Sequence, residues 1–155
     1  MIRGSHSLTP IATVRSPRIA LTDDDWGRVE SVIELAEGIP AESLDGLEAF
    51  SHVEVLFLFD QVEADKIVTG ARHPRNNDAW PKVGIFAQRG KNRPNRLGST
   101  IVRVLRRNGS RLHVRGLDAV DGTPVVDLKP VMREFLPREE VTRPAWSTDL
   151  MQGSR

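Results

Sequence analysis

The stretch Ser-Thr-Ile-Val-Arg-Val-Leu-Arg-Arg-Asn-Gly-Ser-Arg-Leu-His-Val-Arg-Gly (residues 99–116) decides the fold class, because it has the pattern of two strands joined by a tight turn. Apolar and polar residues alternate on both sides of Asn108-Gly109, and this dipeptide suits the two positive φ angles of a type I′ turn. In that register one face is expected to be apolar, with Ile101, Leu105, Leu112 and Val114. The opposite face is expected to be basic, with Arg106, Arg111, His113 and Arg115.

Other segments with a period of two lie on both sides of this hairpin. In residues 52–59 the alternate positions are apolar on both faces, which is typical of a strand in the middle of a sheet or barrel wall. Shorter strands are expected at 10–15, 83–87 and 123–128, a strand or short helix at 28–35, and a connection with some helical character at 39–47. A loop is expected at 18–27, and an irregular, proline-containing tail is expected after residue 130 as far as residue 146. Many short strands without long alternating helices predict a mainly β protein, an antiparallel barrel or sandwich with short helices and long loops.

The length of 155 residues predicts one domain, which we place at residues 8–146, with terminal tails at 1–7 and 147–155. The absence of cysteine excludes disulfides, thiolate metal sites and a cysteine nucleophile. The four histidines are scattered, so we expect no metal site.

The longest apolar run, residues 55–59, is far shorter than the roughly 20 residues of a membrane span, and no secretory signal is evident. We therefore expect a cytoplasmic protein without a membrane partner.

Charge is separated along the chain although the formal net charge is only +1. Residues 21–65 hold thirteen acidic side chains and one basic side chain, whereas residues 79–117 hold ten basic and no acidic ones. This separation favours a cationic surface for an anionic partner, or two complementary faces that meet in an oligomer. A solvated basic strand and a solvated acidic segment would give the same composition.

Two loops are longer and more polar than simple turns require. Residues 84–98 carry four basic side chains with one proline and three glycines, and residues 116–130 combine a tight Asp121-Gly122 turn with alternating charges. The chain lacks the Gly-x-Gly-x-x-Gly dinucleotide motif, the phosphate-binding loop and the Gly-x-Ser-x-Gly nucleophile motif. The two loops are therefore the best candidates for a ligand site.

These loops carry a family resemblance. Phe-Ala-Gln-Arg-x-x-x-Arg-Pro-Asn-x-Leu-Gly (residues 86–98), followed by Gly-Leu-Asp-x-x-Asp-Gly-Thr-Pro-Val-x-Asp-x-Lys-Pro (116–130), resembles the TsaA/TrmO family. Ile-x-Thr-Val-Arg-Ser-Pro (11–17) and Gly-Leu-Glu-Ala-Phe-Ser-His (46–52) match the same family in the same order. The resemblance thus extends over residues 11–130.

The resemblance implies a small antiparallel β-barrel that binds S-adenosyl-L-methionine, as a homodimer with the pocket near the subunit interface. It further implies methylation of N6 of threonylcarbamoyladenosine at position 37 of certain tRNAs. Three departures concern the acceptor more than the cofactor: Asp60 stands where the family often has His, residues 89–92 replace Arg-Ser-Pro, and Pro17-Arg18 is not followed by Gln.

Transferring the motifs residue by residue gives an expected site. The cofactor-binding residues implied are Asp60, Gln61, Arg89, Leu97, Ser99, Leu117, Asp118, Ala119, Val120 and Asp121. Asp118 and Asp121 are also the candidates for a catalytic proton acceptor. The substrate-binding residues implied are Lys91, Arg93, Asn95 and Arg96, with further arginines on the basic strands as phosphate contacts.

Alternatives to a tRNA methyltransferase remain open at this stage. The acceptor can instead be a small molecule, or the domain can bind RNA or the cofactor without catalysis. A non-catalytic RNA-binding domain would show salt-sensitive RNA binding without cofactor binding. A domain that binds only the cofactor would show no methyl transfer.

Overall fold

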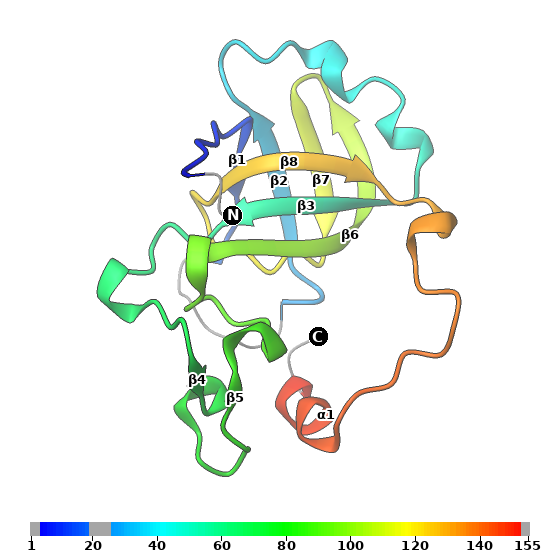
Figure 1. The fold of residues 1–155 in the computed structure, drawn as a ribbon. Coiled ribbons are helices and arrows are strands. Elements are labelled where there is room, and N and C mark those ends of the chain that lie inside the picture. Colours follow the sequence, from blue (N-terminus) through cyan, green and yellow to red (C-terminus); the bar gives the residue numbers. More distant parts are fainter. Residues whose placement is uncertain (1–3, 19–25, 153–155) are drawn as a thin grey trace.

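Six strands close into an antiparallel barrel in the computed structural model, which describes residues 4–18 and 26–152. The barrel strands are β1 (Ala12–Arg15), β2 (Glu30–Leu35), β3 (His52–Leu58), β6 (Leu97–Asn108), β7 (Arg111–Arg115) and β8 (Pro124–Pro130). Their order around the barrel is β1-β2-β7-β6-β3-β8 (Figure 1). The expectation of a mainly β, antiparallel barrel is confirmed.

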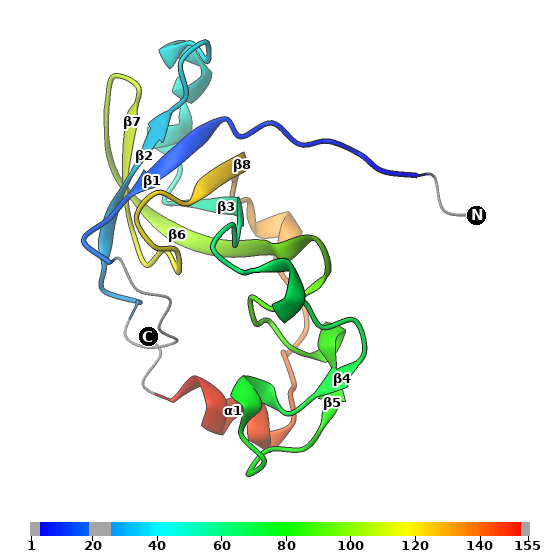
Figure 2. The same cartoon turned by 90° about the vertical axis from the view of Figure 1, so that its left-hand side faces the viewer.

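The remaining elements are short and lie outside the barrel. Strands β4 (Ala71–Arg72) and β5 (Val83–Gly84) form a small ladder below the barrel, and helix α1 (Ala145–Met151) lies at the same lower end (Figures 1 and 2). Single 3₁₀ turns occupy Ala41–Leu44, Leu47–Ala49, Ala64–Lys66, Pro74–Asn76, Ile85–Ala87, Pro94–Arg96 and Arg133–Phe135. No helix within the described residues has the length and apolarity to span a membrane.

Two expected elements differ from the structure. The strand expected at 83–87 ends after Gly84, and Ile85–Ala87 forms a 3₁₀ turn instead. The tail expected to be irregular contains α1, which starts directly after Pro144, where a proline suits the beginning of a helix. The expected loop at 18–27 lies largely outside the described residues.

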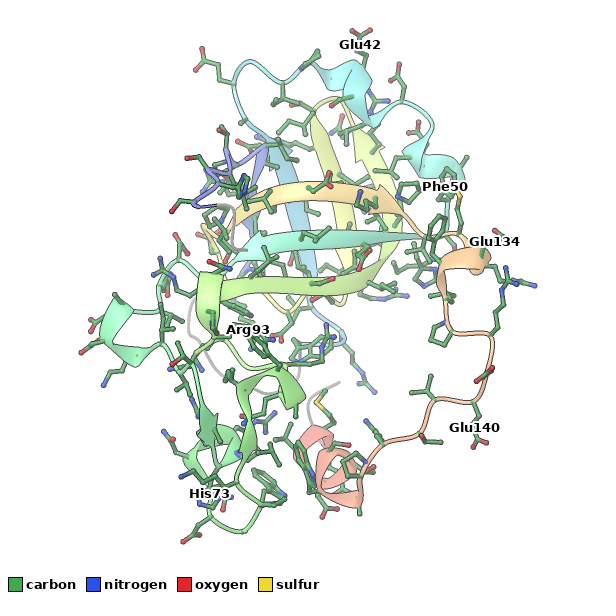
Figure 3. The ribbon with its side chains drawn as sticks, viewed as in Figure 1. Glu42, Phe50, His73, Arg93, Glu134 and Glu140 are labelled. Carbon is green, nitrogen blue, oxygen red and sulfur yellow. The ribbon has the colours of Figure 1, made fainter. Side chains whose placement is uncertain are left out.

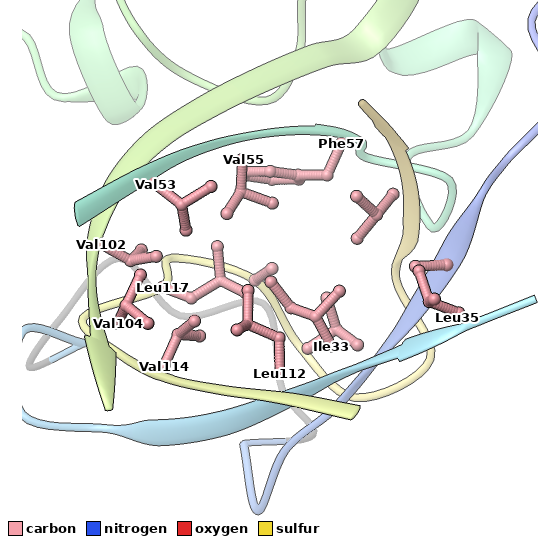
Figure 4. Close-up of a cluster of buried hydrophobic side chains, with 14 of the residues drawn as sticks. Ile33, Leu35, Val53, Val55, Phe57, Val102, Val104, Leu112, Val114 and Leu117 are labelled. Atoms are coloured by element: carbon pink, nitrogen blue, oxygen red, sulfur yellow. The ribbon is translucent and has the colours of Figure 1, made fainter. Parts of the chain in front are cut away.

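The inward-facing side chains of the barrel strands form one apolar core (Figure 4). Strand β3 pairs with β6 on one side and β8 on the other, so its alternate residues Val53, Val55 and Phe57 are at most 1% exposed. Burying each such side chain contributes about 1.5–3 kcal/mol. The pattern of residues 52–59 therefore correctly predicted the central position of β3, and the structure shows that the face with Val53, Val55 and Phe57 is the inner one.

The loop of the β6–β7 hairpin lies one residue later in the sequence than expected. Asn108 pairs with Arg111, and Gly109, with φ 64°, occupies the first loop position, while Ser110 completes a two-residue loop. A positive φ at the first loop residue alone is the pattern of a type II′ turn.

A bulge alters which side chains of β6 face the core. It lies between Val104 and Arg106, so Val102 and Val104 face the core. The expected inner positions of Ile101 and Leu105 are wrong: Ile101 is 44% exposed and Leu105 lies at the bulge. Leu112 and Val114 do face the core, as expected.

Barrel closure brings three strand ends to one place. In an antiparallel barrel every second strand runs in the same direction, so β1, β7 and β3 all end at one end of the barrel. The segments that follow these strands are therefore neighbours in space although they are far apart in sequence.

Gly98 allows β6 to pass close to the aromatic side chains of β3. A Cβ at this position would lie 2.6 Å from two ring atoms of Phe57 and 3.0 Å from the Phe59 ring. The two rings pack edge to face with centroids 5.2 Å apart. Glycine is thus required here by the close approach.

We predict that Gly98→Ala lowers the free energy of unfolding by about 1–3 kcal/mol, because the methyl group overpacks the ring of Phe57. Urea unfolding followed by tryptophan fluorescence measures this. Gly84→Ala is the matched control, since no atom lies within 4 Å of its Cβ position and its φ is not positive. Equal stability of both variants would contradict the packing argument.

Candidate functional site

A pocket lies at the end of the barrel where β1, β3 and β7 finish. Four segments form it: the residue Arg18 after β1, residues 59–61 after β3, residues 89–91 before β6, and residues 118–123 between β7 and β8. The residues that line it are Arg18, Phe59, Asp60, Gln61, Arg89, Gly90, Lys91, Asp118, Ala119, Val120 and Thr123. The two motif-bearing loops thus meet at one site.

An ion pair joins two of the segments that line this pocket. Arg18 Nη1 donates a hydrogen bond to Asp118 Oδ1 at 2.7 Å, and the Arg18 side chain is only 11% exposed. A charge-assisted hydrogen bond of this length is among the stronger polar contacts in proteins. The pair therefore gives the Asp118 carboxylate a defined position in the pocket.

Asp121 forms two hydrogen bonds with the segment that follows β1. Its Oδ1 accepts a hydrogen bond from the Ser16 backbone N–H at 3.0 Å, and its own N–H donates to the Arg18 carbonyl at 2.7 Å. Asp121 is absent from the described residues that line the pocket. Its carboxylate joins the end of β1 to the loop after β7, so the structure places Asp121 beside the site and Asp118 in it.

Arg89 is fixed by the strand that follows its loop. Its Nη2 donates to the Ser99 carbonyl at 2.8 Å. The preceding Gln88 uses Nε2 to bind the Arg72 carbonyl at 3.0 Å and the Val83 carbonyl at 3.1 Å, which anchors the loop to the β4–β5 ladder. Arg89 therefore presents a cation at the pocket from a loop held at two points.

Several predicted cofactor-binding residues lie in the pocket, and others do not. Those that line it are Asp60, Gln61, Arg89, Asp118, Ala119 and Val120. Leu117 is fully buried in the barrel core, and Leu97 is 39% exposed on β6, so neither supplies the expected apolar wall within the described part of the chain. Ser99 acts through its carbonyl on Arg89 and through its hydroxyl on Glu54, at 2.9 Å.

Of the four predicted substrate-binding residues, one lines the pocket and three do not. Lys91 lines the pocket. Asn95 is exposed. Arg93 and Arg96 are half-buried, and both donate to carbonyls of the neighbouring loops.

Four lining residues were not predicted: Arg18, Phe59, Gly90 and Thr123. A signal for Arg18 was present, since Pro17-Arg18 matches the first two positions of the family's Pro-Arg-Gln segment. Phe59 directly follows β3 and packs edge to face against Phe57, a position that the strand pattern places at the barrel end.

Basic residues cover the outer face of β6 and β7. Arg103 pairs in register with Arg115, and Arg106 with His113. Partial burial and the cations of Arg106 and Arg111 lower the pKa of His113, whereas Glu30 opposes this shift. Like charges placed opposite each other destabilise a sheet, so this face is better suited to an anionic partner than to stability alone.

Two arginines of the hairpin have partners on neighbouring elements of the chain. Arg107 Nη1 binds Asp45 Oδ1 at 2.5 Å and its Nη2 binds the Ala41 carbonyl at 2.8 Å. Arg111 Nε lies 3.3 Å from Glu34 Oε2. Arg103, Arg106 and Arg115 are exposed on the same two strands.

The pocket has both cationic and anionic side chains, so it suits a ligand that carries both a positive and a negative charge. Arg18, Arg89 and Lys91 offer cationic donors, Asp60 and Asp118 offer carboxylates, and Phe59 offers an aromatic surface. A zwitterionic amino-acid group, an additional cation and a flat heterocycle have complementary chemistry.

The chain is similar in sequence to known proteins. Residues 15–135 match the family model described as the tRNA-methyltransferase O N-terminal domain. The chain is 36% identical over 138 residues to a putative S-adenosylmethionine-dependent methyltransferase RcsF of Pseudomonas aeruginosa, covering 81% of this chain and 55% of that protein. It is 37% identical over 105 residues to a human tRNA (adenine(37)-N6)-methyltransferase, covering 68% and 23%.

Solved structures agree with the sequence matches. A crystal structure of TrmO from P. aeruginosa superposes with a TM-score of 0.74 at 29% identity, covering 92% of this chain and 62% of that chain. The chain spans about half the length of the P. aeruginosa methyltransferase that it matches. The resemblance noted in the sequence is confirmed, and the chain belongs to the TsaA/TrmO family through its tRNA-methyltransferase O N-terminal domain.

Proposed function

We propose that this chain binds S-adenosylmethionine in the barrel-end pocket and methylates an adenosine in tRNA, at N6 of threonylcarbamoyladenosine 37. The observation that carries the proposal is the presence of three cationic and two anionic side chains in one pocket of a TrmO-type barrel. Related proteins named as S-adenosylmethionine-dependent methyltransferases and as tRNA (adenine(37)-N6)-methyltransferases support it. A cytoplasmic location belongs to the same proposal, since tRNA is the acceptor.

The charges of the pocket residues support the following roles. Arg89, together with Lys91, is placed to bind the carboxylate of the cofactor's amino-acid group, because a guanidinium can form two parallel hydrogen bonds with a carboxylate. Asp60 is placed to favour the cofactor's cationic groups. Phe59 suits the adenine ring.

When bound, the cofactor supplies an electrophilic methyl group, so that the sulfonium becomes a thioether while the acceptor nitrogen gains the methyl group and loses one proton. Alignment of the acceptor with the methyl group can account for much of the rate. Asp118 is the better supported of the two predicted proton acceptors, since it lines the pocket whereas the Asp121 carboxylate binds the Ser16 backbone.

The basic outer face of β6 and β7 supports tRNA as the acceptor. Arg103, Arg106 and Arg115 are exposed there, and phosphate contacts of this kind give most of the affinity for nucleic acid. Because β7 ends beside the pocket, the basic face leads towards the pocket along the barrel wall.

A homodimer is a further part of the proposal. Large apolar side chains are exposed near β6 and on the segment after β8: Phe86, Leu97, Ile101, Met132, Phe135 and Leu136. Phe86 is 78% and Phe135 83% exposed, and packing such side chains against a second copy would remove apolar surface from water. A second copy of the chain is the partner that the family resemblance implies.

For cofactor binding, we predict that Arg89→Ala raises the dissociation constant of S-adenosylmethionine about 10- to 100-fold, as expected for loss of hydrogen bonds to a charged group. Isothermal titration calorimetry of the intact chain measures this. Arg138→Ala is the control, because Arg138 is exposed in the segment after β8. Absence of binding by the wild-type chain would refute the cofactor assignment, and an unchanged constant in the variant would refute the role of Arg89.

For the acceptor, we predict that incubation with methyl-labelled S-adenosylmethionine and bulk tRNA transfers the label to tRNA. The variants Arg103→Gln and Arg106→Gln should each lower the slope of log affinity against log salt by about 0.7–0.9, the value for one phosphate contact. Label in low-mass compounds would indicate a small-molecule acceptor instead. Cofactor binding without any transfer would indicate a non-catalytic domain.

For the assembly, we predict that light scattering after gel filtration gives twice the chain mass of 17.3 kDa. The variants Phe135→Asp and Ile101→Asp should shift the mass towards one chain, because each places a charge on the apolar surface. A monomeric wild-type chain at micromolar concentration would contradict the dimer.

A further inference from the structure

We infer that Arg93 and Arg96 are positioning residues that hold the two loops of the pocket, and that they do not bind phosphates of the acceptor. The inference rests on the proposed cofactor site. It replaces the substrate-binding role that the motif suggested for these two arginines.

Arg96 holds both ends of the turn that follows β3. Its carbonyl accepts the Phe59 N–H at 2.8 Å, and its Nη1 donates to the Val62 carbonyl at 2.6 Å. Phe59 and Val62 are themselves joined by a backbone hydrogen bond of 3.2 Å. The two residues between them are Asp60 and Gln61, which line the pocket. One arginine therefore binds the first and the last residue of the turn that carries them.

Arg93 holds the residues on both sides of Arg89. Its Nη1 donates to the Gln88 carbonyl at 2.6 Å and makes a longer contact of 3.5 Å with the Gly90 carbonyl. Its backbone N–H donates to the Lys91 carbonyl at 3.0 Å. In Figure 3 Arg93 lies between the barrel and the β4–β5 ladder. The orientation of Arg89 and Lys91 thus depends on contacts to Arg93.

The two arginines belong to one turn, so the two loops are held relative to each other. The Arg96 N–H donates to the Arg93 carbonyl at 3.0 Å. Between them, Asn95 has φ 63°, and Arg96 itself has φ 50°, both in the left-handed region that side chains other than glycine rarely adopt. Such conformations persist where the surroundings enforce them, and they cluster at functional sites.

A phosphate-binding role fits these contacts poorly. Both side chains are half-buried and donate to carbonyls of the same chain, whereas Arg103 and Arg106 are exposed on the outer face of the barrel. Arginine satisfies buried carbonyl groups well because its planar guanidinium carries five donors. The turn at residues 93–96 is therefore a brace between the loop at 59–62 and the loop at 88–91.

The test uses the full chain with Arg93→Gln and Arg96→Gly. Glycine adopts a positive φ without strain, so Arg96→Gly should retain the turn and lose only the side chain. Arg93→Lys and Arg96→Lys keep the charge and one donor, and they serve as conservative variants that should behave between wild type and the neutral variants. Arg138→Gln is the control for charge, since it removes one exposed arginine far from this turn in sequence.

Three measurements separate a brace from a phosphate contact. We expect faster amide exchange at residues 59–62 in Arg96→Gly and at residues 88–91 in Arg93→Gln, measured without cofactor. We expect the dissociation constant of S-adenosylmethionine to rise about tenfold in both variants. We expect the salt dependence of tRNA binding to keep its wild-type slope.

Wild-type exchange and wild-type cofactor affinity in both variants would overturn the inference. If the salt slope then falls by about 0.7–0.9, the arginines bind phosphate after all. Failure of the wild-type chain to bind the cofactor would refute the proposed function, while amide exchange would still decide whether the two arginines brace the loops. If a neutral variant does not fold, the lysine variant decides by the same exchange measurement.

Discussion

Closure of the sheet is the constraint on which the site depends. A six-stranded antiparallel barrel has three strands running each way, so β1, β3 and β7 must end together. The pocket contains residues from the segment after each of these strands, and the loop before β6 completes it. An open sheet with the same strands would separate Arg18 from Arg89, because β1 and β6 are not neighbours in the order.

The strand pattern predicted an antiparallel barrel or sandwich because burial selects one face of each strand, and the family resemblance implied the barrel. Val53, Val55 and Phe57 alternate and are buried, as a period of two requires. The hairpin register was wrong because the pattern alone does not distinguish a loop at Asn108-Gly109 from one at Gly109-Ser110. Moving the loop by one residue changes the pairs but leaves Leu105 on the same face as Leu112 and Val114. The bulge at Leu105 exchanges the faces of β6, and no local signal reveals it.

Several predicted site residues lie on loops that reach the pocket, whereas others from the same motifs lie in the core or on a strand. Asp60, Arg89 and Asp118 follow or precede strands and line the pocket. Leu117 belongs to the same motif but is fully buried, since the chain is still passing through the core at that point. Arg93 and Arg96 resemble phosphate ligands in sequence, because a charge pattern does not show which carbonyl groups lie within reach.

The hydrogen bonds beside the pocket join residues that are far apart in the sequence, and this affects the stability of the whole chain. Arg18 and Asp118 are 100 positions apart, and Ser16 and Asp121 are 105. A molecule held by all four segments would act as a reversible cross-link, closing loops of a length for which the entropy of closure is large. Since only the folded chain unites the four segments, ligand concentration would set the resistance of the entire barrel to heat, proteolysis and turnover.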